Sequence, residues 1–164
     1  MFGAMDAPLL IIWHSRTGAS EALARAAFDG AGGRARLLAC TDVEPVDLLA
    51  ASGYLFACPE NLASMSGSMK EMFDRCYYPV LGQIEGRAYA TLIAAGSDGE
   101  GAQRQIDRIA TGWRLRRVAD PLIVNLSAQT QAEILAQKRV PPRVLGQARN
   151  LGAAIAEGLA LGLF

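Results

Sequence analysis

The feature that most constrains the fold is the regular alternation of short apolar runs with segments of helical pattern. Five runs are almost continuously apolar, which is typical of strands that are covered on both faces. The expected strands are Pro8 to Trp13, Arg36 to Cys40, Tyr54 to Cys58, Tyr89 to Ala95 and Leu122 to Leu126. The expected helices are Glu21 to Asp29, Pro45 to Ala51, Gly67 to Tyr77, Ala102 to Leu115 and Val144 to Leu161. Strands that alternate with helices predict a parallel sheet joined by right-handed crossovers.

The same runs predict the order of the strands. The first run is the most hydrophobic and should be central, whereas Pro121 begins the last run and is typical of an edge strand, because proline cannot donate to a neighbour. We therefore expect an α/β protein, a three-layer α/β/α sandwich with a five-stranded parallel sheet in 2-1-3-4-5 order. In that order the ligand site lies at the carboxyl ends of the first and third strands.

The length of 164 residues fits one domain, residues 1–164. Between the last expected strand and helix, the polar segment Ser127 to Pro142 indicates a short extra helix, and Pro141 and Pro142 are expected to act as a stop before the final helix.

Composition excludes several classes of partner and site. Sixteen basic and sixteen acidic residues give no net charge, which argues against nucleic acid or an anionic membrane as partner. No apolar run reaches the roughly 18 residues of a membrane span, and the first seven residues lack a signal-peptide pattern. Three cysteines without paired spacing and a single histidine argue against a zinc site and suit a reducing compartment. We expect a cytoplasmic protein with small-molecule partners.

The first expected strand leads directly into a loop of small and hydroxyl residues before a helix. Such a turn directs backbone N–H groups and the positive helix end at one point, where hydroxyl groups can add hydrogen bonds to a phosphate. Gly18 allows a close approach of the backbone, and no Lys follows it, so the loop is not a triphosphate P-loop. The alternative is an ordinary helix start with Ser20 as N-cap. The candidate phosphate ligands are Ser15, Arg16, Thr17, Gly18, Ala19 and Ser20.

Two further loops follow the third and fourth expected strands. In the first, a proline at the expected strand end precedes a loop that leads into a helix at Gly67; its candidate ligands are Pro59, Glu60, Asn61, Leu62, Ala63, Met65 and Ser66. The second has three glycines in six residues, which indicate a sharp turn or a close approach to a ligand; the alternative is a common strand-to-helix loop. Its candidate ligands are Gly96, Ser97, Asp98, Gly99 and Gly101.

These loops carry a resemblance to a known family. Residues 12–20 resemble the phosphate-binding loop of the flavodoxin-like superfamily, and Pro59, Asn61 and Met65 to Lys70 resemble the second flavin-contacting loop of NAD(P)H-dependent FMN reductases. The glycine-rich loop falls where that family has its third loop. The resemblance covers nearly the whole chain. It implies FMN as cofactor, with its phosphate on Ser15 to Ser20, its isoalloxazine ring on the backbone of Pro59 to Ser66, and the pyrimidine edge of the ring beside Gly96.

Two departures from the electron-transfer flavodoxins bear on function. Those proteins are acidic and clamp the ring between aromatic residues, whereas this chain is neutral and residues 60–66 contain no aromatic. Leu62, Met65 or a second subunit would have to cover the ring, which is compatible with a homodimer or tetramer. Flavodoxins also use a loop glycine at positive φ for one-electron chemistry, and this loop begins with Glu60 and Asn61, of which only Asn tolerates that conformation well.

We therefore predict a NAD(P)H-dependent oxidoreductase that passes hydride through flavin N5 to a quinone, a flavin or a similar acceptor. This chemistry requires no catalytic side chain, because the flavin carries it. The alternative is a non-enzymatic electron-transfer flavodoxin. A phosphatase loop of the C-x5-R type is excluded, since no cysteine has an arginine six residues later. The adjacent pair His14 and Ser15 suggests a hydrolase, but neighbours on a strand point to opposite faces, which argues against that function.

Overall fold

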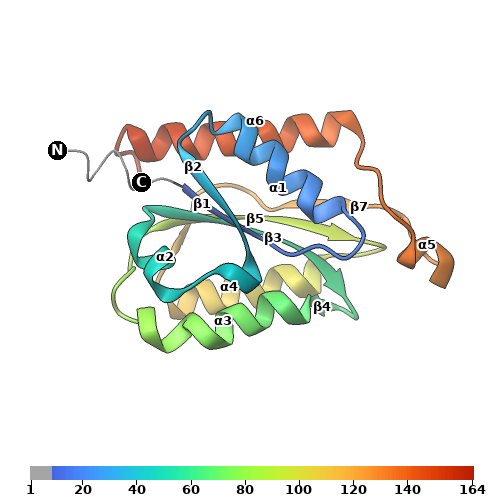
Figure 1. Ribbon diagram of the computed structural model, residues 1–164, viewed down its shortest axis with the longest axis horizontal. Coiled ribbons are helices and arrows are strands. Elements are labelled where there is room, and N and C mark those ends of the chain that lie inside the picture. Colours follow the sequence, from blue (N-terminus) through green and yellow to red (C-terminus); the bar gives the residue numbers. More distant parts are fainter. Residues whose placement is uncertain (1–8) are drawn as a thin grey trace.

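A parallel sheet forms the middle layer of the structure, with helices on both faces (Figure 1). The computed structural model describes residues 9–164, so Pro8, expected to begin the first strand, lies outside the described residues. The main strands are β1 (Leu9–Trp13), β2 (Ala35–Ala39), β3 (Gly53–Asn61), β5 (Ala88–Ala95) and β7 (Leu122–Asn125). Two-residue strands β4 (Ser64–Met65) and β6 (Arg116–Arg117) pair with β3 and β5.

The order of the main strands is β2-β1-β3-β5-β7, all parallel, with β6 also pairing β5. The expected 2-1-3-4-5 order is therefore confirmed, as are the interior position of β1 and the edge position of the strand that follows Pro121. Leu9 to Ile12 are fully buried, which explains why the first run is apolar without alternation.

Helices cover both faces of the sheet (Figure 1). The first face carries α1 (Ala19–Gly30) and α6 (Pro142–Ala160), and the second carries α2 (Pro45–Ala50), α3 (Gly67–Val80) and α4 (Glu100–Gly112). A short 3-10 turn, Cys40–Asp42, and the small helix α5 (Gln131–Leu135) complete the elements. Phe56, Phe73 and Trp113 fill the core under α3 and α4, whereas the core under α1 is aliphatic.

Small residues set the distance between α1 and α6. A Cβ atom at Gly152 of α6 would lie 2.0 Å from the Ala27 carbonyl oxygen of α1, and one at Gly30 would lie 2.0 Å from the Arg149 carbonyl oxygen. The two helix backbones therefore touch at both points, where only glycine fits. This contact fixes α1, and with it the end of α1 that meets the first loop.

Several boundaries differ from the sequence-based expectations, among them those of β3, α6 and α4. Strand β3 continues through Pro59 to Asn61, because Pro59 stays in register with Ala94 and its carbonyl accepts a hydrogen bond from Ser66 N. Helix α6 begins at Pro142, where a missing N–H costs nothing, so the proline starts the helix instead of stopping a segment. Helix α4 starts at Glu100, two residues before the expected start.

The expected short extra helix is confirmed as α5. Thr130 and Glu133 cap its first turn reciprocally. Within residues 9–164, no helix combines the length and the apolarity needed to cross a bilayer.

Candidate functional site

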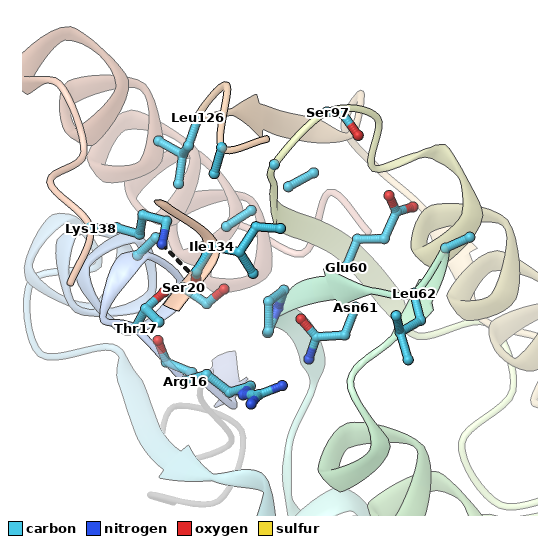
Figure 2. Close-up of a pocket in the computed structure, with 18 residues that line it drawn as sticks. Arg16, Thr17, Ser20, Glu60, Asn61, Leu62, Ser97, Leu126, Ile134 and Lys138 are labelled. Atoms are coloured by element: carbon cyan, nitrogen blue, oxygen red, sulfur yellow. Dashed lines mark hydrogen bonds between the residues drawn. The ribbon is translucent and has the colours of Figure 1, made fainter. Parts of the chain in front are cut away.

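A cavity of about 330 Å³ lies at the carboxyl ends of β1, β3 and β5, which is within the usual range of about 300–1,000 Å³ for small-molecule sites. Its position agrees with the rule for open parallel sheets. Four segments line it (Figure 2). They contribute Ser15, Arg16, Thr17, Ala19 and Ser20 from the β1–α1 loop, Pro59 to Ala63 from the end of β3, Ala94 to Ser97 from the end of β5, and Leu126, Ala128, Ile134 and Lys138 from the connection to α6.

The start of α1 is one end of this cavity. Gly18 is the N-cap residue, with φ 96° and ψ −17°, and its N–H donates to Ser15 Oγ at 3.0 Å. The first bond within the helix runs from Ala22 N to Gly18 O at 3.0 Å. The N–H groups of the first turn before Ala22 therefore have no acceptor inside the helix, and the helix end carries about half a positive charge.

Ser20 lies in this first turn and is the decisive residue of the loop. It is 1% exposed and lines the cavity, and its Oγ has no hydrogen-bond partner within residues 9–164. A buried hydroxyl without a partner costs about 1–3 kcal/mol, so such groups are normally paired. The interpretation of Ser20 as N-cap is wrong, because that position belongs to Gly18. A ligand with acceptor oxygens in the cavity would supply the partner that Ser20 lacks.

Gly18 itself does not line the cavity. Its backbone is in the left-handed region, and a Cβ atom there would lie 2.2 Å from Gln137 Nε2. Glycine therefore suits the left-handed backbone at this helix start, and the side chain of Gln137 lies against it.

The segment after β3 is a hairpin and not an irregular loop. Strands β3 and β4 pair antiparallel, and Leu62 and Ala63 form the two-residue turn between them at φ 54° and 61°. Positive φ at both central residues defines a type I′ turn, for which Asn-Gly is the usual sequence. Leu and Ala at these positions cost about 1–2 kcal/mol each. Positive φ thus occurs at these two residues, and not at Glu60 or Asn61, which belong to β3.

Side chains hold this hairpin on α4. The Glu60 carboxylate accepts hydrogen bonds from Gly99 N at 2.8 Å and from Ala102 N at 3.1 Å, so it caps the start of α4. Gln105 Oε1 of α4 accepts from Met65 N at 2.8 Å and from Ser64 Oγ at 2.9 Å. The hairpin is therefore rigidly attached, and the carboxylate of Glu60 is engaged with the protein although the residue lines the cavity.

Only two of the five candidate ligands in the glycine-rich loop after β5 line the cavity. Gly96 and Ser97 line the cavity, whereas Asp98, Gly99 and Gly101 do not. Gly99 is the N-cap of α4 at φ 97°, and a Cβ at Gly101 would lie 2.1 Å from the Ala63 carbonyl oxygen. These two glycines serve the helix start and the close contact with the hairpin.

Met65 and Ser66 also lie behind the cavity wall, at 3% and 0% exposure. Ser66 Oγ forms a hydrogen bond with His14 Nδ1 at 2.9 Å, which places the single histidine at the end of β1 beside the first loop. Burial, and then the charge of Arg16, lower the pKa of His14 below its ordinary value. Met65 cannot cover a ligand in the cavity from this position, which leaves Leu62, fully exposed at the turn, as the apolar residue of the hairpin that can.

Six lining residues were not predicted. Ala94 and Ala95 end the fourth main strand, so the rule that ligands bind at carboxyl ends of strands could have indicated them. Leu126, Ala128, Ile134 and Lys138 belong to the connection between β7 and α6. No local pattern marks them, because only the folding of this connection back over the first loop brings them to the cavity.

Comparison with known proteins agrees with the position of the loops. A protein family described as NADPH-dependent FMN reductase matches residues 46–129, just over half of the chain. The chain belongs to this family. The match includes the β3–β4 hairpin and the glycine-rich loop, and it ends before α5.

Solved structures show the same flavodoxin-like fold at low sequence identity. A flavodoxin from the domain Archaea superposes with a TM-score of 0.76 at 17% identity, over 93% of this chain and 99% of that one. A flavodoxin, WrbA-like protein from Agrobacterium tumefaciens gives a TM-score of 0.67 at 18% identity, over 94% and 98%. The Flv1 flavodiiron core from Synechocystis sp. PCC6803 gives 0.75 at 14% identity, over 97% of this chain but 37% of that one. No curated protein sequence matches the chain significantly.

Proposed function

We propose that this protein binds FMN in the cavity, with the phosphate at the start of α1 and the isoalloxazine ring between the β3–β4 hairpin and the end of β5. The observation that carries the proposal is the buried, unpaired Ser20 Oγ beside the open N–H groups of α1. A phosphate there would satisfy both the hydroxyl and the helix end. Membership of the NADPH-dependent FMN reductase family supports the same ligand.

The remaining residues of the first loop fit a phosphate as well. Ser15 Oγ accepts from Gly18 N, which leaves its own proton free to donate to a phosphate oxygen. The hydroxyl of Thr17 lines the same cavity, and the exposed guanidinium of Arg16 adds positive charge at its edge. No lining residue of this loop carries a negative charge that would repel the ligand.

The other end of the cavity fits a flat ring. Its walls are backbone and small side chains, with Ala94, Ala95 and Gly96 on one side and Pro59 on another. Such residues leave room close to the backbone, whose N–H and C=O groups can recognise the polar edge of the ring. Leu62 stands at the rim and would contact one face of it.

We further propose that the protein is a NAD(P)H-dependent oxidoreductase. Bound FMN would supply the hydride chemistry, at N5, between NAD(P)H and a quinone, flavin or similar acceptor. The chain's own part is to bind and orient. Glu60 is the one acidic residue of the lining, and two backbone N–H groups already engage its carboxylate, so no lining side chain is assigned as a general acid or base.

We also propose that residues 1–164 act as a single FMN-binding domain in a reducing compartment, the cytoplasm. All three cysteines are free and buried, and burial raises the pKa of the Cys40 thiol to about 11 and that of Cys58 to about 12, which makes them poor nucleophiles. Light scattering on the purified protein would determine whether a second subunit completes the site.

Two measurements test the proposal. Titration of the flavin-free protein with FMN, followed by flavin fluorescence, should show saturable binding, and a protein that takes up no FMN would refute the whole proposal. Stopped-flow mixing of the FMN-loaded protein with NADH and with NADPH should bleach the flavin absorbance. If neither nucleotide reduces the bound FMN, the oxidoreductase is refuted and the non-enzymatic electron-transfer flavodoxin becomes the proposed function.

A further inference from the structure

The connection between β7 and α6, residues 126–141, forms one wall of the cavity. Its backbone is tied to the two loops that it faces. Lys138 N donates to Thr17 O at 2.8 Å in the first loop, and Ala128 N donates to Gly96 O at 3.0 Å in the glycine-rich loop. The wall is therefore held against the start of α1, and Lys138 is the residue at which the two segments meet.

The side chain of Lys138 caps the end of α5. Its Nζ donates to the carbonyl oxygens of Glu133 at 2.7 Å, Ile134 at 2.8 Å and Ala136 at 2.6 Å. These acceptors fix the ammonium group in place, but they are neutral. Lys138 makes no ion pair with any residue in the part of the chain that the structure describes. Lys138 is a half-buried residue of the cavity lining, and its ammonium has no carboxylate partner among those residues.

Lys138 and the start of α1 thus border the same cavity. Lys138 and Ser20 lie on the same side of the cavity (Figure 2), and Ser20 belongs to the first turn of α1, the positive end of that helix. A cation beside a helix N-terminus is unfavourable unless an anion lies between them. Together with the unpaired Ser20 Oγ, this arrangement indicates that the cavity is built for a ligand with a strong negative charge at this end.

We propose that Lys138 is a specificity-determining residue that selects phosphorylated flavin over uncharged riboflavin. The inference rests on the proposed binding of FMN. The ammonium acts through its charge on the phosphate dianion while it keeps its contacts to α5, and attraction of this kind is strong where water is partly excluded. Riboflavin offers the same ring but no such charge, so Lys138 contributes nothing to its binding.

The test compares the affinities of four proteins for FMN and for riboflavin: wild type, Lys138→Met, Lys138→Arg and Arg139→Met. Lys138→Met keeps the apolar stem and removes the charge, and Lys138→Arg keeps the charge. Arg139, the exposed neighbour on the same connection, does not line the cavity and is the matched control. We expect Lys138→Met to weaken FMN about tenfold, or about 1.4 kcal/mol, and to leave riboflavin unchanged. Lys138→Arg should retain most of the FMN affinity, and Arg139→Met all of it.

Other outcomes would contradict the proposed role of Lys138. If Lys138→Met weakens both flavins equally, the lysine only supports α5, and if it weakens neither, or if Arg139→Met has the same effect, Lys138 does not select the phosphate. In these cases wild type still binds FMN and the proposed function stands. If wild type binds neither flavin, the proposed function fails and this inference fails with it.

Discussion

Helices α1 and α4 begin in almost the same way, and they differ in what lies at their first turn. Each follows a parallel strand and has glycine as N-cap, Gly18 at φ 96° and ψ −17° and Gly99 at φ 97° and ψ −19°. At α4 the carboxylate of Glu60 accepts from two backbone N–H groups. At α1 the first-turn carboxylate, Glu21, pairs with Arg25. Within residues 9–164 no carboxylate is seen to accept from the N–H groups of that turn, and a buried serine hydroxyl is left without a partner.

The difference shows how one local geometry serves two purposes. A helix start of this kind attracts an anion. Strand β3 lies between β1 and β5, and Glu60 is its last residue but one. The chain itself thus provides the anion for α4 and fixes the β3–β4 hairpin there. The start of α1 receives none from the chain and borders the cavity, where the phosphate of a ligand can take that place.

The largest effect should come from substitution of Gly99, compared with the equivalent substitution of the other N-cap glycine, Gly18. Gly99→Ala adds strain at positive φ and a Cβ atom 2.4 Å from Ile123 Cγ2, so we expect a loss of about 3 kcal/mol in unfolding free energy. Gly18→Ala should lose about 1 kcal/mol, because the atom in its way is the mobile end of Gln137. Denaturant unfolding measures both. Gly146→Ala, in open space within α6, is the control and should stabilise the protein. Equal losses at the two caps would contradict this difference.

Removal of the internal anion should have the next largest effect. Glu60→Ala leaves the N–H groups of Gly99 and Ala102 without their acceptor, and we expect the unfolding free energy to fall by about 2 kcal/mol. Glu100→Ala removes an exposed carboxylate from the same first turn and should cost less than about 1 kcal/mol. If the two variants are equally destabilised in urea, Glu60 acts only through its charge and not as a cap.

Ser20→Ala should have opposite effects on the affinity for FMN and on the stability of the flavin-free protein. The affinity for FMN should fall about tenfold, because one charge-assisted hydrogen bond to the phosphate is lost. The flavin-free protein should be as stable as wild type or more stable, since a buried unpaired hydroxyl is removed. Fluorescence titration and thermal unfolding measure the two quantities. Ser68→Ala, outside the cavity, is the control, and a flavin-free Ser20→Ala protein that is clearly less stable would show that the hydroxyl has a structural role.

A smaller effect is expected at the strained turn of the hairpin. Ala63→Gly should raise the unfolding free energy by about 1 kcal/mol, because glycine adopts φ 61° without strain. Ala154→Gly, an exposed position in α6, should lower it by a similar amount. A loss of stability in Ala63→Gly would mean that the turn is not strained.

The smallest expected effect is a pH dependence of the unfolding free energy that comes from His14, beside the first loop. His14 is the single histidine, and its pKa in the folded protein is lowered by burial and by Arg16. The unfolded chain therefore binds a proton more readily than the folded protein below about pH 6.5, so stability falls as the pH falls through that range and is complete above it. His14→Gln should flatten this dependence in unfolding experiments from pH 5 to 7. An NMR titration of the imidazole that gave a pKa above its ordinary value would contradict the prediction.

Local sequence predicted much of the fold and part of the site. The apolar runs and Pro121 were sufficient for the strand order, because burial on both faces and the missing N–H of proline are properties of each strand alone. The three loops were located by their positions after strands. Within them, residues 15–17, 19–20, 59–63 and 96–97 line the cavity, whereas Gly18, Met65, Ser66, Asp98, Gly99 and Gly101 do not.

What the sequence by itself determined is therefore the order of the strands and the end of the sheet at which the cavity lies. Only the tertiary structure decided which helix start stays open for a ligand. That outcome depends on contacts between distant segments, Glu60 with the start of α4 and Lys138 with Thr17. Residue type and local periodicity describe the neighbours of a residue along the chain, and these contacts arise only when the sheet register and the packing of α1 on α6 bring separate loops together.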